Sequence, residues 1–436
     1  MQIMDEIKQV HAIEVLDSRG NPTIMTKVVF ADGSTGVAKV PSGASTGARE
    51  ALELRDGDDR YLGKGVTKAV ENVNTVLAEA VKSADPLSFE GLDAAMLRAD
   101  GTEDKSKLGA NAILSVSMAA AVALAKDEGM ELFEFLRTRV LGADDGYLQP
   151  VPMSNVINGG EHAGNDLAIQ EFMILPVGAS NIREAIQCIS EIYHVLGTQM
   201  VSKYGQVAKN IGDEGGYCGF GLEKTTDAFD EIMKAVEEAG YSPGKDVVFG
   251  IDAAASEFHE DGIYHIDGKE LPPEELLEFY LGLEKSYPLQ SVEDPFDETA
   301  FDDFAAYTKE SDVQVVTDDL TVSNPDIVSE AIDIEVGNSL LLKVNQIGTV
   351  TEAIEAARVA NEAGWSVVVS HRSGETGDTF IADLAVALST GQIKTGAPAR
   401  SDRVAKYNRL LEIYDVLDGT CDYPGPDFRT AWRDYQ

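Results

Sequence analysis

The chain has 436 residues, 44% of them hydrophobic, which is enough apolar material for one large and one smaller domain. Its 75 acidic residues outnumber its 35 basic ones, and the formal net charge is −40. Nucleic-acid binding needs a basic face, so this balance argues against it. The acids are spread along the whole chain, which favours a protein adapted to high salt over a merely acidic cytosolic one.

Cysteine usage and hydropathy indicate a cytoplasmic protein. Cys188, Cys218 and Cys421 lie far apart and fit neither a disulfide framework nor a zinc-binding spacing. The N-terminal residues carry no hydrophobic signal core. The longest uncharged run, residues 108–125, contains glycine, asparagine and serines, and we expect a buried alanine-rich helix there rather than a membrane span.

The first 140 residues combine strand patterns with helical ones. Residues 7–40 predict short strands separated by turns, and Pro41-Ser-Gly-Ala-Ser45-Thr-Gly47 is too rich in small residues for regular structure. Apolar residues then recur at helical spacing over 66–80, 92–97 and 109–126. Strands followed by helices predict a small α+β domain over residues 1–140.

Residues 141–436 alternate strand patterns with amphipathic segments. This alternation of strand and helix patterns predicts a β/α barrel, and the alternative fold is a doubly wound open sheet. No Gly-x-Gly-x-x-Gly follows the first strand, so nothing supports a dinucleotide-binding version. The expected strands lie at 171–176, 208–212, 247–252, 289–293, 313–318, 339–343, 366–371 and 391–395. The expected helices between them include 273–285, 299–309, 325–332, 349–363 and 378–388.

Several of the predicted strands end on charged residues, and a barrel would bring those ends to one mouth. Asp252, Glu293 and Asp318 end three consecutive strands. Three carboxylates at one mouth repel one another unless a cation lies between them, and all-oxygen ligands beside substrate and water favour Mg²⁺ over Ca²⁺. Taken singly, each could equally be a helix N-cap or a surface ion pair.

Two lysines, Lys343 and Lys394, end strands at the same mouth. Near Mg²⁺ and partly desolvated, a lysine can have a lowered pKa and act as a base. Alternatively, a lysine at this mouth only neutralises the charge of the carboxylates. That role would account for one lysine at the mouth better than for two. The run His371-Arg-Ser-Gly374 offers an imidazole, a guanidinium fork and a hydroxyl, which suit a phosphate.

Long and uncommon motifs then give this chain a resemblance to the enolase family over nearly its full length. The motifs are Asp17-Ser-Arg-Gly-Asn-Pro-Thr23, Pro41-Ser-Gly-Ala-Ser-Thr-Gly47, Ile157-Asn-Gly-Gly-Glu-His-Ala163, Ile169-Gln-Glu-Phe-Met173, Gly212-Asp-Glu-Gly-Gly216, Val292-Glu-Asp-Pro-Phe296, Leu341-Leu-Lys-Val-Asn-Gln-Ile-Gly348, Ser370-His-Arg-Ser-Gly-Glu375 and Ile393-Lys-Thr-Gly-Ala-Pro398. The resemblance implies an enolase-type barrel over residues 141–436 and reversible dehydration of 2-phospho-D-glycerate to phosphoenolpyruvate.

The resemblance also implies roles for individual residues. Lys343 would take the proton from carbon 2, while Glu214 assists loss of the 3-hydroxyl, with Glu171 beside it. Two Mg²⁺ would stabilise the substrate's carboxylate dianion. The expected metal ligands are Asp252, Glu293 and Asp318 for the tighter ion and Ser45, on a mobile loop, for a second ion that arrives with substrate. The expected substrate-binding residues are His162, Gln170, Glu171, His371, Arg372, Ser373 and Lys394.

These roles lead us to expect that the three carboxylates hold metal opposite Lys343 rather than pair with it.

The run Tyr217-Cys-Gly-Phe-Gly221 departs from the family's usual Phe-Ala-Pro-Asn, which leaves the conformation of this loop open. A homodimer or larger homo-oligomer is implied as well. The competing functions are a related dehydratase or racemase for a non-phosphorylated acid, and a non-catalytic surface-binding scaffold.

Overall fold

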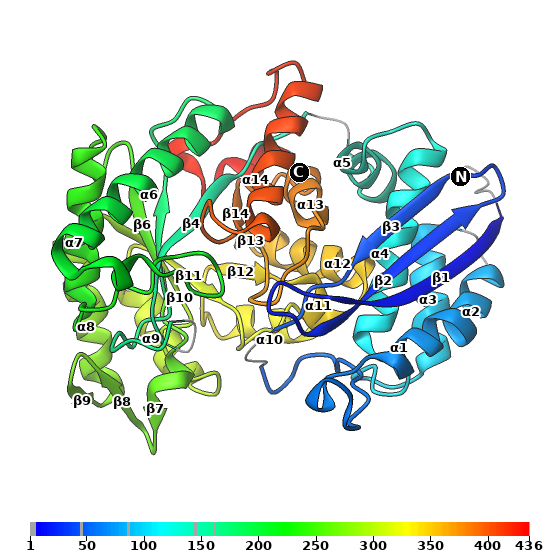
Figure 1. Ribbon diagram of the computed structural model, residues 1–436, viewed down its shortest axis with the longest axis horizontal. Helices are drawn as coiled ribbons and strands as arrows, with labels where there is room; N and C mark the ends of the chain where they lie inside the picture. The colour runs from blue at the N-terminus through cyan, green and yellow to red at the C-terminus, as the bar shows by residue number, and fades with distance from the viewer. Residues whose placement is uncertain (1–5, 44–46, 85–87, 144–145, 161–162, 436) are drawn as a thin grey trace.

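The computed structural model describes residues 6–43, 47–84, 88–143, 146–160 and 163–435, and it consists of two units lying side by side (Figure 1). The smaller unit is a three-stranded antiparallel sheet in the order β1-β2-β3, packed against helices. Its strands are β1 (Ile7–Leu16), β2 (Pro22–Phe30) and β3 (Thr35–Lys39). Its helices are α1 (Thr67–Asn72), α2 (Ala78–Lys82), α3 (Phe89–Asp100), α4 (Ala110–Asp127) and α5 (Leu132–Phe135).

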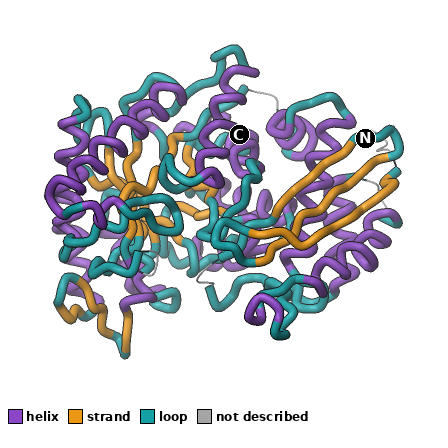
Figure 2. The backbone as a smooth tube through the Cα atoms, in the orientation of Figure 1, coloured by secondary structure: helices purple, strands orange, loops and turns teal. Residues whose placement is uncertain are grey.

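The larger unit is a closed barrel of eight strands surrounded by helices (Figure 2). Its strands are β4 (Val151–Asn158), β5 (Glu171–Leu175), β6 (Val248–Asp252), β10 (Leu289–Glu293), β11 (Gln314–Thr317), β12 (Ser339–Leu342), β13 (Ser366–Ser370) and β14 (Gln392–Lys394). Its helices are α6 (Ile182–Tyr204), α7 (Thr225–Glu238), α8 (Pro273–Ser286), α9 (Phe301–Glu310), α10 (Pro325–Asp333), α11 (Val344–Ile347), α12 (Val350–Glu362), α13 (Phe380–Ala387) and α14 (Ser401–Val416). A small sheet of β7 (His259–Glu260), β8 (Ile263–Ile266) and β9 (Lys269–Leu271) lies outside the barrel.

The predicted fold class, a β/α barrel with a smaller α+β unit, is confirmed, and the five expected barrel helices are present. One predicted strand is wrong. Residues 208–212 form the end of a 3-10 helix and an isolated bridge, and the eighth barrel strand is β4, at 151–158. The sequence of β4, Val-Pro-Met-Ser-Asn-Val-Ile-Asn, contains proline, serine and two asparagines, which are typical of turns and disfavoured in strands. The division at residue 140 stays a prediction.

The barrel also departs from uniform parallel pairing. β5 runs antiparallel to both of its neighbours, β4 and β6, whereas the remaining pairs are parallel. A residue at the start of β5 therefore lies at the same mouth as residues at the ends of the other strands. Glu171, the first residue of β5, pairs in register with Asp252, the last residue of β6.

Helix α4 is the one described helix whose length and composition would suit a membrane span, and 83% of that segment is buried inside the protein. It packs against β2 and β3, and fifteen of its eighteen residues are buried, as in a core helix. The predicted buried alanine-rich helix at 108–125 is confirmed.

A buried carboxylate joins the two units. Asp93 on α3 accepts hydrogen bonds from Ser117 Oγ at 3.0 Å and from the backbone N and Oγ1 of Thr351 at 3.1 and 2.6 Å. Thr351 belongs to the first turn of the barrel helix α12. Burial raises the pKa of Asp93 to about 6, although these hydrogen bonds act in the opposite direction.

This pKa makes the stability of the protein depend on pH. Because the folded-state pKa lies above the ordinary value of 3.8, the folded protein binds the proton more tightly, and stability falls as pH rises from about 4 through 6. In Asp93→Asn this ionisation is absent. We expect the variant's free energy of unfolding, relative to the parent protein, to rise by about 1.4 kcal/mol between pH 5 and pH 8.

Urea unfolding at the two pH values measures this difference. Glu237→Gln, at an exposed position on α7, is the control and should leave the difference near zero. An Asp93→Asn difference that stays constant between pH 5 and pH 8 would contradict the expectation.

Candidate active site

Side chains from most barrel strands converge at one mouth. They surround a cavity of about 40 Å³, which has room for a few water molecules. Ten of the residues predicted from the sequence line it: Gln170, Glu171, Glu214, Asp252, Asp318, Lys343, His371, Arg372, Ser373 and Lys394. Glu293 lies fully buried beside them, in contact with Lys394. The predicted Ser45 and His162 fall outside the described residues.

Three acids stand next to one another on adjacent strands of the barrel. Glu171 pairs in register with Asp252, and Asp252 with Glu293, so the three carboxylates reach the same side of the mouth. Lys394, at the end of β14, lies among them. Its Nζ is 3.0 Å from Glu171 Oε1, 2.9 Å from Asp252 Oδ2 and 2.8 Å from both oxygens of Glu293.

Burial and mutual repulsion disturb the pKa values of this cluster. Burial raises the pKa of Glu171 well above its usual range, and the charge of Glu214 raises it further. Burial and Asp252 do the same for Glu293. Burial alone would lower the pKa of Lys394, but the surrounding carboxylates outweigh it and hold the pKa above its ordinary value. Lys394 is therefore a fixed positive charge in this arrangement.

Lys343 is also paired with an acid, which corrects one expectation. Its Nζ donates to Asp318 Oδ2, whereas we had expected the metal-binding carboxylates to face Lys343 without pairing with it. Burial would lower the pKa of Lys343, but Asp318 outweighs this and raises it above the ordinary value. The pKa of Lys343 is therefore raised and not lowered as expected, because the negative charge of Asp318 lies next to its ammonium group.

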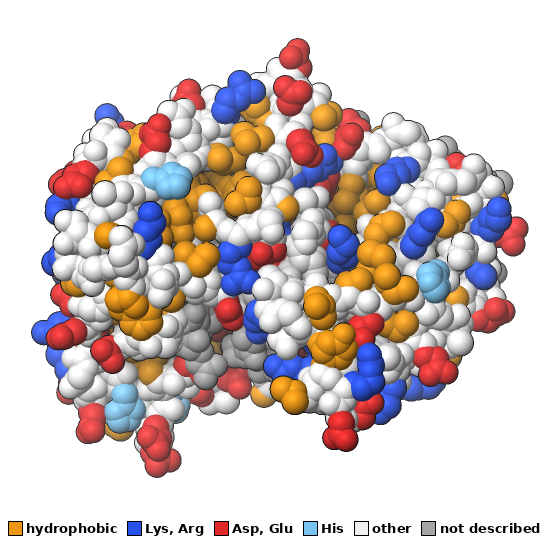
Figure 3. Space-filling model, in the orientation of Figure 1, with side chains coloured by type: hydrophobic (Ala, Val, Ile, Leu, Met, Phe, Trp, Pro, Cys, Tyr) orange, Lys and Arg blue, Asp and Glu red, His pale blue; other side chains and the backbone are white. Residues whose placement is uncertain are grey.

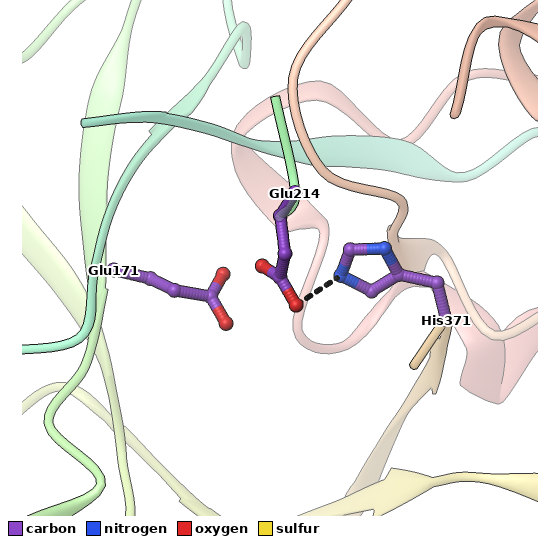
Figure 4. A group of neighbouring side chains, drawn as sticks. All are labelled: Glu171, Glu214 and His371. Carbon is purple, nitrogen blue, oxygen red and sulfur yellow. Dashed lines mark ion pairs between the residues drawn. The ribbon is translucent and has the colours of Figure 1, made fainter. Parts of the chain in front are cut away.

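His371 lies between Glu214 and a buried arginine. Its Nε2 is 3.6 Å from Glu214 Oε1, and Figure 4 shows the ring directed at that carboxylate. Arg403 Nη1 contacts the other ring nitrogen, Nδ1. A guanidinium can only donate, so Nδ1 accepts and the ring proton belongs on Nε2, facing Glu214. Burial lowers the pKa of His371 well below its usual value, and the positive charge of Arg403 lowers it further.

Arg403 also holds the two loops on either side of this contact. It donates to the carbonyls of Arg372 at 2.6 Å and Ser373 at 2.7 Å, and to the carbonyl of Asp213 at 3.3 Å. Its side chain is completely buried. One residue of helix α14 therefore fixes both the loop that carries Glu214 and the loop that carries His371.

The atypical run 217–221 has a definite conformation in the structure. Tyr217 extends the edge of β4: its N donates to Val156 O at 2.9 Å and its O accepts from Asn158 N at 2.9 Å. Its ring stacks on Tyr193, with centroids 4.3 Å apart. Tyr193 Oη donates to Gly215 O at 2.7 Å, next to Glu214. The unusual tyrosine thus helps to anchor the Glu214 loop.

Arg372 forms a buried two-point ion pair with Glu50 at the mouth. Its two terminal nitrogens donate to the two carboxylate oxygens of Glu50, each at 3.0 Å, and Nη1 donates to Asn345 Oδ1 at 3.1 Å. Glu50 comes from the smaller unit, shortly after Gly47. Arg372 and Glu50 are both almost fully buried, and they join the two units at the site.

The donor set at this mouth fits a hard divalent cation. The described lining residues include seven carboxylates against three basic side chains. Glu171 Oε2 is buried with no hydrogen-bond partner in the described part of the protein. Two groups of potential ligands have atoms within 4.8 Å of one another: Glu171, Glu214 and His371, and Asp294, Asp318 and Asp319. Oxygen-rich, negatively charged sites of this kind suit Mg²⁺.

Sequence reasoning missed several residues that the structure brings to the site. Glu50 and Arg403 are the principal ones, together with Asn345, Asp294 and Asp319. Asp294 Oδ1 and Oδ2 accept from the backbone N of Asp318 at 2.8 Å and of Asp319 at 2.9 Å, which fixes the Asp318 loop. Asp294 and Asp319 are direct neighbours of predicted residues and could have been noticed. Glu50 and Arg403 lie far from them in the chain, and no local pattern marks them.

A closed barrel with charged and polar side chains gathered at one mouth is the arrangement of a barrel enzyme. Comparison with protein-family models gives two matches: "Enolase, C-terminal TIM barrel domain" over residues 146–432 and "Enolase, N-terminal domain" over residues 7–136. The chain belongs to the enolase family.

Curated relatives support the same conclusion. The chain is 55% identical over 431 residues to an enolase of Thermococcus kodakarensis, covering 98% of this chain and 99% of the relative. It is 52% identical over 424 residues to an enolase of Methanocaldococcus jannaschii, covering 97% and 98%. An enolase of Methanosarcina barkeri is 52% identical over 420 residues, with 96% of each chain covered.

The position of Arg403 predicts that it acts through His371. In Arg403→Gln the ring loses the donor at Nδ1, and we expect turnover to fall about 10- to 100-fold, with the pKa of His371 rising. Nitrogen NMR of the histidine rings reports both the tautomer and the pKa. Arg400→Gln is the matched control, because Arg400 donates to Ser18 O at 2.6 Å and does not contact His371. An unchanged pKa of His371 in Arg403→Gln would contradict this account.

Proposed function

We propose that this enolase-family lyase interconverts 2-phospho-D-glycerate and phosphoenolpyruvate in glycolysis and gluconeogenesis. The observation that carries the proposal is the arrangement of the mouth: a lysine on one side, a carboxylate–histidine pair on another, and an arginine fork with a hydroxyl beside them. A three-carbon acid with a phosphate needs these three functions, and the near full-length identity to curated enolases supports the assignment.

Lys343 is the proposed base. Its Nζ would take the proton from carbon 2 of the substrate, which is weakly acidic because the adjacent carboxylate is already charged. To do so Lys343 must first give up a proton, and its contact with Asp318 opposes this. The base therefore becomes competent when the negative charge of Asp318 is engaged elsewhere.

Glu214 is the proposed acid for loss of the 3-hydroxyl, with Glu171 beside it. Both are buried, and repulsion between them favours keeping one proton in the pair. Asn155 Nδ2 donates to Glu214 Oε2 at 3.2 Å and His371 faces Oε1, so the carboxyl group is held in one orientation. Glu214 would deliver its proton to the departing oxygen, and His371 would position it.

The remaining predicted residues bind substrate in this proposal. Arg372 and Ser373 would hold the phosphate, and Gln170, Lys394 and His162 the carboxylate end and its surroundings. Arg372 is suited to this because its planar fork matches two oxygens of one anion. Lys394 keeps its charge and so contributes attraction rather than proton transfer.

We assign Asp252, Glu293 and Asp318 to one Mg²⁺, and Ser45 to a second that arrives with substrate. Bound Mg²⁺ supplies positive charge against the negative charge that develops on the substrate's carboxylate. The three acids are buried at one mouth and carry only oxygen donors. For them to bind an ion, Lys394 and Lys343 must give up part of their contacts with these acids.

We further propose a cytoplasmic homodimer or larger homo-oligomer from an organism of high internal salt. The homo-oligomer and the cytoplasmic location rest on membership of the family. The support for salt adaptation is the net charge of −40 and the scatter of acidic side chains over the face shown in Figure 3. Such a coat repels itself at low ionic strength, and salt screens the repulsion. Activity measured against KCl concentration tests the salt adaptation, and light scattering measures the size of the assembly. Maximal activity at low KCl concentration would refute the salt adaptation.

The central test is the formation of phosphoenolpyruvate, followed by absorbance at 240 nm, with Mg²⁺ and high KCl. We expect turnover that disappears on adding EDTA and returns with Mg²⁺, because the acid-rich mouth needs a cation. A panel of non-phosphorylated hydroxy acids should give no product. Purified, folded protein with no turnover of 2-phospho-D-glycerate would refute the proposed reaction.

Lys343→Ala tests the base directly. Removing a general base typically costs 10²- to 10⁴-fold, and we expect kcat to fall by about 10³-fold or more while the fold is kept. Lys285→Ala, at an exposed position near the end of α8, is the control. Lys343→Ala protein that retains most of its activity would remove Lys343 from the role of base.

A further inference from the structure

The pairing of Arg372 with Glu50 occupies the part of the site that an anion would need. Both carboxylate oxygens of Glu50 accept from Arg372, one from each terminal nitrogen, at 3.0 Å. A phosphate would present two oxygens to the same two nitrogens, since the guanidinium fork matches either anion. The two side chains are almost fully buried, with exposed fractions of 4% for Arg372 and 7% for Glu50.

Glu50 and a bound phosphate cannot share this fork. A dianion at hydrogen-bond distance from a buried carboxylate would be repelled strongly, because little water is present to screen the two charges. Among the contacts to described residues, Arg372 Nη1 also donates to Asn345 Oδ1 at 3.1 Å, and this amide oxygen is neutral and compatible with either anion. The arrangement therefore allows two alternatives, Glu50 or phosphate, on an arginine that stays in place.

Glu50 has other partners that do not depend on Arg372. Its Oε1 accepts from Gly47 N at 3.1 Å and lies 3.5 Å from Gln346 Nε2. Gln346 in turn donates to Asp318 Oδ1 at 2.8 Å and accepts from Ser323 Oγ. A carboxylate that leaves Arg372 thus retains donors nearby, which limits the cost of displacing it.

We propose that Glu50 holds the place of the substrate's phosphate on Arg372, and that binding requires the phosphate to displace it. This makes Glu50 a specificity-determining residue: a substrate without a second strong anion leaves the carboxylate on the arginine. The proposal rests on the proposed function, in which Arg372 binds the phosphate group.

Binding of inorganic phosphate to the full-length protein, measured by calorimetry at fixed KCl and without Mg²⁺, tests the proposal. In Glu50→Gln the competing charge is absent, and we expect the Kd for phosphate to fall at least tenfold. Glu53→Gln is the matched control. Glu53 lies in the same segment but accepts hydrogen bonds from Ser42 Oγ at 3.0 Å and Arg55 Nη2 at 2.7 Å. The Kd of Glu53→Gln for phosphate should therefore stay within twofold of that of the parent protein.

The outcomes separate this proposal from the proposed function. Arg372→Gln should abolish phosphate binding; if it binds as the parent does, the phosphate role of Arg372 fails. If Arg372→Gln loses binding but Glu50→Gln binds phosphate equally or more weakly, Glu50 orients the arginine instead and the displacement proposal is overturned. Should Glu50→Gln not melt cooperatively, Glu50→Asp replaces it: the shorter carboxylate cannot reach both nitrogens, and a Kd that fails to fall at least threefold overturns the proposal.

A selectivity measurement completes the experiment. D-glycerate, which lacks the phosphate, is used as an inhibitor of turnover in the parent protein and in Glu50→Gln. Because it does not compete with Glu50 for the arginine, its inhibition constant should change less than twofold. An equal tightening of glycerate and phosphate would indicate a general loosening of the site and would overturn the specificity role.

Discussion

Negative charge buried at the mouth of the barrel is the constraint on which this site depends. Glu171, Asp252 and Glu293 stand on adjacent strands at matching positions, where two unit charges 4 Å apart repel by about 4 kcal/mol at an effective dielectric of 20. The sheet leaves them no room to separate. The positive charge of the Lys394 ammonium group offsets this repulsion, because it lies within 3.0 Å of all three acids. A site built this way has a strong affinity for positive charge.

The same constraint explains why the lysines of the site differ. Lys394 sits among three carboxylates and keeps its proton, whereas Lys343 has one direct carboxylate partner, Asp318. Asp318 is itself tied to Gln346 and to the loop fixed by Asp294, so its position does not depend on Lys343. Of the two, Lys343 is the lysine whose proton is more easily released when positive charge reaches its neighbour.

Much of this arrangement could be predicted from the sequence, because strand ends in a β/α barrel meet at one mouth. Asp252, Glu293, Asp318, Lys343 and Lys394 were placed together on that basis alone. β4 could not be predicted, because its proline, serine and asparagines are typical of turns, and the reversal of β5 could not, because the direction of a strand leaves no local signature. The ion pairs between the site's lysines and carboxylates could not be predicted either. Whether a carboxylate contacts a lysine or another acid depends on distances of a few ångströms, which the sequence does not specify.

The two principal residues that sequence reasoning missed, Arg403 and Glu50, reach the site from elements outside the barrel strands and their loops. Arg403 comes from α14, after the last barrel strand, and Glu50 from the smaller unit. Each bears a full charge and is buried, which is costly without partners. They have partners within the site: His371 and three loop carbonyls for Arg403, and Arg372 for Glu50. Their burial is therefore tolerated because the site exists. The smaller unit, through Glu50, supplies one of the charges that determine whether the arginine is available to an anion.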